Sequence, residues 1–334
     1  MNKEIILKSL PHGMVVPENF EMREHALAST LQEGEVWLKS RYISVDPYMR
    51  GRMSTAKSYV AGFEPGKPID GGVIAEVVES KYPNLQKGDV VLGNLPWREQ
   101  QITKGEGLTK LQKDVAPLSY YLGILGMPGL TAYLGLTRIG EPQSGETVVV
   151  SGAAGAVGSV VGQIAKIKGC RVVGIAGSQD KIDYLKNELG FDEVINYKET
   201  QNMAGSIAKA CPDGVDVYFD NVGGEISDAV MLQLNRFARI VLCGQISMYN
   251  DTETPTGPRP QGMMVKNSVL MKGFIVRDYA EHFPEAVQQL AQWIKEGKLS
   301  YRETILQGFD KLPEAFIGLF TGKNTGKLLV EINE

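Results

Sequence analysis

Short apolar runs and helical patterns alternate through the second half of the chain. Residues 147–151 (Thr-Val-Val-Val-Ser) form an apolar run that is typical of a strand buried on both faces. Residues 157–167 then carry Val and Ile at helical spacing and end near Gly169. The alternation continues with further predicted strands at 171–176, 193–197, 215–220, 239–243 and 269–276. Such strand–helix alternation predicts right-handed crossovers and a parallel, doubly wound sheet.

Two of the predicted helices also have recognisable ends. Ser178 or Asp180 can cap a helix that Gly190 stops. A helix with Pro284 in its first turn closes the unit before Gly297. These ends fit the parallel, doubly wound architecture predicted for this half of the chain.

The first part of the chain has a different pattern, with short alternating runs between turns. Together with the last residues it predicts strands at 35–45, 72–79, 88–93 and 326–332. We therefore expect a β-rich, partly barrel-shaped domain made of residues 1–126 and 298–334. A Rossmann domain, residues 127–297, is inserted into it.

Composition restricts the class of protein. The chain has 334 residues, 35 basic and 39 acidic side chains, and a net charge of −4, so two soluble-type domains are expected. No long basic run favours nucleic acid, and no segment has the length and composition of a signal peptide or a membrane span. Cys170, Cys211 and Cys243 are odd in number and far apart, which favours a reducing, cytoplasmic location over a disulfide framework.

The strongest motif is a glycine-rich turn between the strand at 147–151 and the next helix. It reads Ser-Gly-Ala-Ala-Gly-Ala-Val-Gly, with glycines at 152, 155 and 158. Gly152 permits the tight turn, Gly155 lets the backbone approach a pyrophosphate, and Gly158 lets helix and strand pack closely. The alternative is a glycine-rich turn without a ligand. No Gly-Lys-Ser/Thr occurs, so a P-loop is excluded.

The tip of the second strand indicates which dinucleotide binds. An NAD enzyme usually has an acid there for the ribose 2′-hydroxyl, but this strand ends Ile-Ala-Gly-Ser at residues 175–178. Lys181 and Tyr197 follow, and a lysine beside a neutral tip suits a 2′-phosphate. Asp180 is the competing ribose acid, and we interpret it as a helix cap. The pattern favours NADPH.

Metal ligands and hydrolase motifs are missing from the sequence. The only histidines are His12, His25 and His282, and no Gly-His-Glu, Cys-x-x-Cys or Gly-x-Ser-x-Gly occurs. Hydroxyls, backbone amides and the nicotinamide ribose must then polarise a substrate carbonyl. That is sufficient for adding hydride to the β-carbon of an enone, which favours reduction of an activated C=C bond.

Several segments, in order along nearly the whole chain, together resemble one known family. They are Ser-Val-Asp-Pro-Tyr-Met-Arg-Gly-Arg (44–52), Met-Pro-Gly-Leu-Thr-Ala-Tyr (127–133), the glycine turn, Asp-Asn-Val-Gly-Gly (220–224), Cys-Gly-Gln-Ile-Ser-Met-Tyr-Asn (243–250) and Gly-Lys-Asn-Thr-Gly-Lys (322–327). The chain resembles the zinc-independent medium-chain dehydrogenase/reductases. The nearest group contains leukotriene hydroxydehydrogenase/prostaglandin reductases, plant alkenal double-bond reductases and bacterial NADPH-dependent curcumin reductases. The resemblance implies a GroES-like β-rich domain around the Rossmann domain.

The same resemblance implies a set of cofactor and substrate residues. Gly155, Ala156, Val157 and Gly158 would meet the pyrophosphate, and Gly177, Lys181 and Tyr197 would surround the 2′-phosphate. The ribose and nicotinamide would be lined by Asn221, Cys243, Gly244, Gln245, Ile246, Ser247, Tyr249, Phe274, Ile275 and Val276, with Asn324 reaching the cofactor from the tail. Tyr48 would border the substrate, and Tyr249 would donate to the substrate oxygen or organise the ribose hydroxyl.

Each of these assignments has a plainer alternative. Tyr48 can be a packed tyrosine of the β-rich domain, and Tyr249 can be structural. Cys243 is interpreted as a small residue facing the cofactor, not as a nucleophile. Loop 250–262 can be a surface connection, a lid over the substrate or a dimer contact.

We therefore expect an NADPH-dependent reductase of α,β-unsaturated ketones and aldehydes. It would act as a homodimer without a metal, a nucleic acid or a membrane as partner. The alternatives are a quinone oxidoreductase on the same scaffold and a nonenzymatic NADPH-binding protein.

Overall fold

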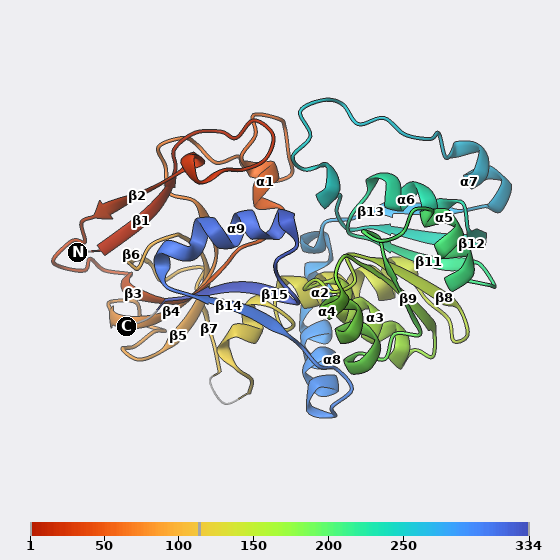
Figure 1. Ribbon diagram of the computed structural model, residues 1–334. Coiled ribbons are helices and arrows are strands. Elements are labelled where there is room, and N and C mark those ends of the chain that lie inside the picture. The colour runs from red at the N-terminus through yellow and green to blue at the C-terminus, as the bar shows by residue number, and fades with distance from the viewer. Residues whose placement is uncertain (1, 113–114, 333–334) are drawn as a thin grey trace. The chain divides into compact units, whose positions relative to one another are not determined.

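The computed structural model describes residues 2–112 and 115–332, which fall into two compact units (Figure 1). Unit 1 takes in the described parts of residues 1–122, 304–324 and 328–334. Unit 2 takes in residues 123–303 and 325–327. In the described part of the chain, no helix combines the length and the apolar character needed to cross a membrane.

Unit 1 is built on a seven-stranded sheet in the order β14-β15-β3-β4-β5-β7, with β6 also pairing with β3. The strands are β3 (Glu35–Ser44), β4 (Asp70–Ser80), β5 (Val90–Pro96), β6 (Gln100–Lys104), β7 (Thr109–Lys110), β14 (Glu303–Gln307) and β15 (Lys327–Glu331). β15 pairs antiparallel with β3, so that Leu329 lies opposite Ser44. The end of the chain thus pairs with the sheet of unit 1.

A hairpin and two helices complete unit 1. The hairpin is formed by β1 (Asn2–Leu7) and β2 (Phe20–His25), and the helices are α1 (Met49–Arg52) and α9 (Leu312–Thr321). The ring of Phe316 on α9 meets that of Phe20 edge to face, with centroids 6.2 Å apart. Both rings belong to one apolar core that also contains residues of β3, β4 and β15.

Unit 2 is built on a six-stranded parallel sheet in the order β10-β9-β8-β11-β12-β13. The strands are β8 (Thr147–Ser151), β9 (Arg171–Ala176), β10 (Glu193–Asn196), β11 (Val215–Asp220), β12 (Leu234–Leu242) and β13 (Leu270–Gly273). All five residues of β8 are buried, which explains why its sequence is apolar without alternation. The order reverses direction at β8, as in a doubly wound fold.

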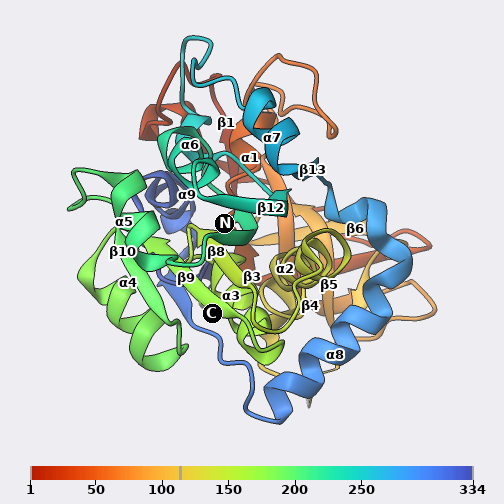
Figure 2. The ribbon, with the colours of Figure 1, turned by 90° about the vertical axis from the view of Figure 1, so that its right-hand side faces the viewer.

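Helices cover both faces of this sheet. They are α2 (Met127–Gly135), α3 (Gly158–Ile167), α4 (Gln179–Asp183), α5 (Met203–Ala210), α6 (Gly224–Met231), α7 (Gln261–Asn267) and α8 (Phe283–Lys295). α2 packs on both α3 and α8, whereas α5 and α6 pack on each other. Figure 2 shows these two groups on opposite sides of the strands. The doubly wound parallel sheet and the separate antiparallel sheet confirm the predicted fold class.

Three elements of unit 2 differ from the sequence prediction. Strand β12 begins at Leu234 instead of residue 239, and its pairing with β11 is irregular around Phe237, which has φ 64° and an exposed side chain. Strand β13 ends at Gly273. The helix predicted from residue 178 to Gly190 is α4 followed by a π-helical turn, Tyr184–Glu188. Ser178 is the residue at its N-cap, so our interpretation of Asp180 as the cap was wrong, and Asp180 lies in the first turn.

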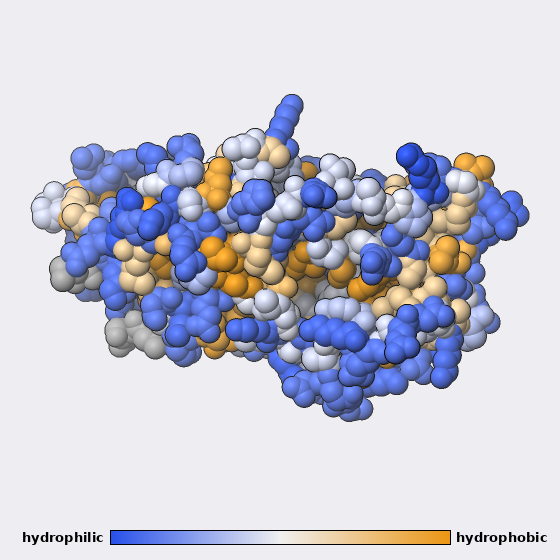
Figure 3. Space-filling view, turned by 45° about the horizontal axis from the view of Figure 1, so that its top comes forward, coloured by the Kyte–Doolittle hydropathy of each residue, from blue (hydrophilic) through white to orange (hydrophobic). Residues whose placement is uncertain are grey.

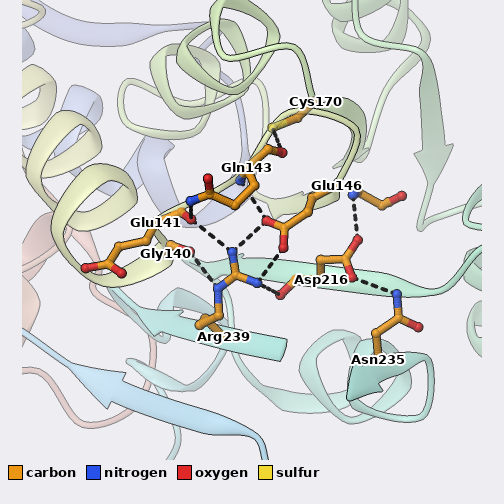
Figure 4. Close-up of polar contacts among 9 residues, drawn as sticks. Gly140, Glu141, Gln143, Glu146, Cys170, Asp216, Asn235 and Arg239 are labelled. Carbon is orange, nitrogen blue, oxygen red and sulfur yellow. Dashed lines mark hydrogen bonds and ion pairs between the residues drawn. The ribbon is translucent and has the colours of Figure 1, made fainter. Parts of the chain in front are cut away.

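A polar cluster holds the amino-terminal ends of β8 and β11 (Figure 4). The guanidinium of Arg239 donates to both carboxylate oxygens of Glu146, at 2.6 and 2.9 Å. The carboxylate of Asp216 accepts from the N–H of Thr147 and from the side-chain amide of Asn235, each at 2.8 Å. This cluster lies at the edge of the sheet opposite to the glycine-rich turn.

Candidate active site

The carboxyl ends of the six parallel strands meet at one edge of the unit 2 sheet. Because the strands are parallel, the segment that follows each of them begins at this edge. The predicted cofactor residues of unit 2 all lie in these segments: Gly155–Gly158 after β8, Gly177 and Lys181 after β9, Tyr197 after β10, Asn221 after β11, the 243–249 segment after β12, and Phe274–Val276 after β13. The structure therefore gathers residues that are up to 121 positions apart in the chain, from 155 to 276, on one edge.

The glycine-rich turn is compact because its glycines leave no room for side chains. Gly152 has φ 59°, in the left-handed region. A Cβ on Gly158 would lie 2.4 Å from the carbonyl oxygen of Gly152, so the first turn of α3 can sit directly on this turn. Ala156 and Val157 are half-buried at the start of α3. The turn presents backbone N–H groups at a helix N-terminus, which is the arrangement that binds a pyrophosphate.

The tip of β9 is neutral and has two lysines near it. A Cβ on Gly177 would lie 2.5 Å from the ring of Tyr197, so this ring covers the strand tip. Burial lowers the pKa of Lys181, and the charge of Lys198 lowers it further. Asp180 is exposed. Two mutually repelling cations beside an aromatic ring fit a bound phosphate dianion.

Asn221 is fixed at the end of β11 by the end of β8. Its side-chain amide donates to the carbonyl oxygen of Ser151 at 2.8 Å, and its N–H donates to the Ser151 hydroxyl at 2.9 Å. The segment after β11 is thereby tied to the residue that begins the glycine-rich turn.

The 243–249 segment is tied to the same place. The N–H groups of Cys243 and Gly244 donate to the carbonyl oxygen of Asp220 at 2.8 and 3.1 Å. The Ser247 hydroxyl and N–H both donate to the carbonyl oxygen of Val222, at 2.6 and 3.1 Å. The segments that follow β8, β11 and β12, which are neighbouring strands, therefore form one connected wall at the edge of the sheet.

Tyr249 folds back over its own segment. Its hydroxyl accepts a hydrogen bond from the N–H of Gln245 at 3.3 Å, and a Cβ on Gly244 would lie 3.0 Å from it. The phenol is half-buried. Its hydroxyl therefore lies beside the segment that the sequence assigns to the nicotinamide ribose.

Cys243 does not have the environment of a nucleophile. Burial raises the pKa of its thiol to about 12, and the negative charge of Asp220 contributes to the rise. A thiol with such a pKa stays protonated near neutral pH. The thiol is therefore unsuited to act as a nucleophile, and the interpretation of Cys243 as a small residue facing the cofactor stays a prediction.

Phe274 begins the segment after β13 and packs back onto helix α2. A Cβ on Gly135 would lie 2.6 Å from the tip of the Phe274 ring. The ring also meets that of Tyr279 edge to face, with centroids 6.2 Å apart. Ile275 and Val276 are half-buried beside it.

Two of the predicted site residues, Tyr48 and Asn324, belong to unit 1. Tyr48 is the residue before α1, and its pKa is raised well above the usual value, first by burial and then by the charge of Asp46. Near it, Arg52 holds Asp70 at 2.6 Å and lies over the ring of Phe63, 3.8 Å from its centroid. The raised pKa keeps the Tyr48 phenol protonated, and so able to donate a hydrogen bond, near neutral pH.

Sequence reasoning missed two residues at the edge of the unit 2 sheet. Lys198 follows Tyr197 directly and was available as a second cation. Asp220 is the first residue of the Asp-Asn-Val-Gly-Gly segment, and its hydrogen bonds to other segments could not be seen from a linear pattern. As for metal ligands, residues 2–112 and 115–332 contain no group of three or more His, Cys, Asp or Glu side chains that could hold an ion.

Two family models match the chain, one in its first third and one in the part that forms most of unit 2. One is described as the N-terminal domain of oxidoreductase and matches residues 3–111, and the other as a zinc-binding dehydrogenase and matches residues 156–295. The chain is 57% identical to the Bacillus subtilis oxidoreductase YfmJ, over 99% of this chain and 98% of that protein. The chain belongs to the medium-chain dehydrogenase/reductase family.

Relatives within this family have named activities. The NADPH-dependent curcumin reductase of Escherichia coli is 46% identical over 99% of this chain and 97% of that protein. Among solved structures, CurA of Vibrio vulnificus in complex with NADPH has a TM-score of 0.94 and 44% identity, and the match covers 99% of each chain. The resemblance to medium-chain dehydrogenase/reductases that the sequence motifs indicated is therefore confirmed.

Proposed function

We propose that this medium-chain dehydrogenase/reductase is an NADPH-dependent reductase of the activated C=C bond of α,β-unsaturated ketones and aldehydes. The observation that carries the proposal is the carboxyl edge of the unit 2 sheet. There the glycine-rich turn, the neutral tip of β9 and the Lys181–Lys198 pair provide for a pyrophosphate and a 2′-phosphate. The curcumin reductase activity of the Escherichia coli relative supports the choice of an enone as substrate.

The residues of the chain have distinct tasks in this reaction. The backbone of residues 155–158 holds the pyrophosphate, and Gly177, Lys181 and Tyr197 hold the 2′-phosphate. Asn221 and the residues of the 243–249 segment orient the ribose and nicotinamide, with Phe274, Ile275, Val276 and Asn324. Bound NADPH supplies the hydride.

Tyr249 and Tyr48 act on the substrate. The Tyr249 hydroxyl donates a hydrogen bond to the carbonyl oxygen, which gains negative charge as hydride adds to the β-carbon. Tyr48 borders the substrate. A proton from solvent adds to the α-carbon, so that NADPH, enone and one proton give NADP⁺ and the saturated ketone.

The substrate-binding module is assigned to residues 1–126 with 298–334, and the cofactor module to residues 127–297.

The enzyme is further proposed to work as a homodimer that forms through the β13 edge of the unit 2 sheet. β13 is the last strand of that sheet. Leu270 on it is 52% exposed and Val265 on α7 is 81% exposed. Figure 3 shows hydrophobic (orange) atoms at the right-hand end, the side of unit 2 on which Figure 1 places α7. An unpaired edge strand with exposed apolar side chains favours pairing with a second copy.

Sedimentation of the variants Leu270→Lys and Val265→Glu tests this dimer. Both variants should sediment as monomers. Leu232→Lys is the control and should remain dimeric, because Leu232, at the carboxyl end of α6, is 69% exposed but is not part of the proposed interface. A wild-type monomer would refute the dimer.

The three free cysteines fit the proposed cytoplasmic location, where thiols stay reduced.

Rapid mixing of NADPH-loaded enzyme with an enone, an enal and a quinone tests the reaction. We expect loss of NADPH absorbance with the first two and a saturated product whose carbonyl is intact. Oxidation by the quinone alone would identify a quinone oxidoreductase. Tight NADPH binding with no turnover on the whole panel would identify a nonenzymatic binding protein.

A further inference from the structure

Asp220 is a buried carboxylate that ends strand β11 and directly precedes Asn221. Its side chain is 1% exposed. One carboxylate oxygen, Oδ1, accepts four hydrogen bonds: from the hydroxyls of Ser151 and Tyr218 at 2.8 Å, and from the N–H groups of Val222 and Gly223 at 2.9 Å. Four donors that converge on a single oxygen are the arrangement that suits an ionised carboxylate.

The other oxygen of this carboxylate is left without a partner. Oδ2 of Asp220 is buried and accepts no hydrogen bond from the residues that the structure describes. Nor does Asp220 form an ion pair with any described Lys, Arg or His. The four donors to Oδ1 are neutral dipoles, so the site retains a net charge of about −1 inside the protein.

This charge lies next to the segments assigned to the nicotinamide half of the cofactor, which begin at Asn221 and at Cys243. The carbonyl oxygen of Asp220 accepts from the N–H groups of Cys243 and Gly244, so the 243–249 segment begins against the backbone of Asp220. The negative charge also reaches the Cys243 thiol, because it contributes to the rise in the pKa of that group. In a buried site such a charge acts over several ångströms with little screening.

The two redox states of the cofactor differ by one charge at the nicotinamide ring. When a hydride leaves the dihydronicotinamide, two electrons and a proton go with it and the ring becomes cationic. A fixed carboxylate nearby therefore stabilises the oxidised form relative to the reduced form.

We propose that Asp220 is an electrostatic residue that favours NADP⁺ over NADPH in this site and thereby promotes hydride donation. The proposal rests on the proposed function, since it takes the segments that follow β11 and β12 to be the nicotinamide site. Asp220 touches neither the substrate nor the cofactor in this account. It acts through its charge.

The ratio of the dissociation constants, Kd(NADP⁺) divided by Kd(NADPH), measures this effect by calorimetry without any substrate. Asp220→Asn keeps the size of the side chain and an acceptor oxygen but removes the charge. We expect this variant to raise the ratio by about three- to tenfold, because NADP⁺ loses more affinity than NADPH. If both affinities change by the same factor, or if neither changes, Asp220 has only a structural role and the proposal is wrong.

A second variant predicts the opposite sign. Tyr218→Phe removes one of the four donors to Oδ1 and keeps the packing of a ring that is fully buried. The carboxylate is then less compensated, so the ratio should fall, by roughly twofold. An increase in the ratio would contradict the proposal even if Asp220→Asn does not fold.

Asp216→Asn is the matched control. Asp216 is on the same strand but at its other end, where its carboxylate accepts from Thr147 and Asn235 (Figure 4). Its neutralisation should leave the ratio unchanged, and a shift as large as that of Asp220→Asn would show that location does not matter. Because no substrate is present, the ratio stays informative if the enzyme proves inactive on enones. If the wild type binds neither form of the cofactor, both proposals fail.

Discussion

The N–H of Gly326 donates a hydrogen bond of 2.8 Å to the carbonyl oxygen of Ala154, inside the glycine-rich turn. Gly326 and Gly155 also form an isolated parallel bridge. The last part of the chain thus supports the turn that is proposed to hold the pyrophosphate. Gly326 has φ 68°, and a Cβ on it would lie 1.8 Å from the carbonyl oxygen of Arg302.

Gly326→Ala should therefore displace the support of the glycine-rich turn. We expect the free energy of unfolding to fall by about 3 kcal/mol, from backbone strain and overlap with Arg302 together. The Kd for NADPH should rise by at least ~5-fold, because the amides of the turn move. Denaturant unfolding and fluorescence titration measure the two effects.

The control for this variant is Gly297→Ala. Gly297 has φ 69° but nothing lies within 4 Å of an added Cβ. It should lose only about 1 kcal/mol from its backbone conformation, with unchanged NADPH affinity. Equal effects of the two substitutions would mean that Gly326 does not support the turn.

Lys181→Ala should weaken the binding of NADPH far more than that of NADH. A charge-assisted hydrogen bond to the 2′-phosphate is worth about tenfold to hundredfold in Kd, and NADH has no such phosphate. Lys186→Ala is a suitable control, because Lys186 pairs with Glu193 on an exposed surface at 3.0 Å. Equal losses for the two dinucleotides in Lys181→Ala would contradict the phosphate assignment.

The affinity for NADPH should also depend on pH through Lys181. Its folded-state pKa is lowered from 10.5 by burial and by Lys198, so its charge is present at neutral pH and is lost earlier on the alkaline side than for an ordinary lysine. NADPH affinity should decrease as pH rises through this lowered pKa, whereas NADH affinity should stay constant.

Lys198→Ala identifies the group that titrates. Without the charge of Lys198, the pKa of Lys181 rises, so the alkaline loss of NADPH affinity should move to higher pH. Titration of each variant with NADPH across the alkaline range measures the midpoint. A midpoint that stays in place or moves downward would show that Lys181 does not cause the loss.

The buried strands of unit 2 could be predicted from the sequence because their burial leaves a clear pattern. β8 and β9 have the predicted bounds, since both are apolar runs enclosed by turn residues. The early start of β12 could not be predicted, because Asn235 and Arg236 are polar and Phe237 adopts a left-handed conformation. The hairpin β1–β2 and helix α9 are stabilised by tertiary packing such as that of Phe20 on Phe316, which local patterns do not contain.

The candidate site was predictable to the same degree. Residues that directly follow a strand, such as Gly155, Lys181 and Asn221, can be placed from the strand order alone. The role of Asp220 depends on hydrogen bonds to Ser151 and Tyr218, and that of Gly326 on a contact more than 170 positions away along the chain. The division into domains at residues 126 and 297, and the roles of Tyr48 and Asn324, remain predictions.

Removal of metal ions should leave the reaction intact. Among the residues that the structure describes, no group of three or more His, Cys, Asp or Glu side chains could hold an ion. We expect turnover of an enone to be unchanged after dialysis against a strong chelator and to be unaffected by added zinc. A zinc-dependent alcohol dehydrogenase treated in the same way provides the positive control. A large loss that zinc restores would show that a metal takes part.

Tyr249→Phe should separate catalysis from cofactor binding. The Tyr249 hydroxyl lies at the segment proposed to hold the nicotinamide ribose, where it accepts from the N–H of Gln245. Without this donor to the developing negative charge on the carbonyl oxygen, kcat should fall by about tenfold to hundredfold. The Kd for NADPH should stay within about twofold, because the phosphates supply most of the binding.

Single-turnover kinetics with enones and calorimetry with NADPH measure these two quantities. Tyr279→Phe is the control, because its ring packs against Phe274 at 6.2 Å and its hydroxyl has no assigned role in the reaction. If Tyr249→Phe keeps wild-type turnover on every enone, the tyrosine only shapes its segment. If kcat and NADPH affinity fall together, the hydroxyl organises the ribose. Only a fall in kcat alone assigns the hydroxyl to the substrate oxygen.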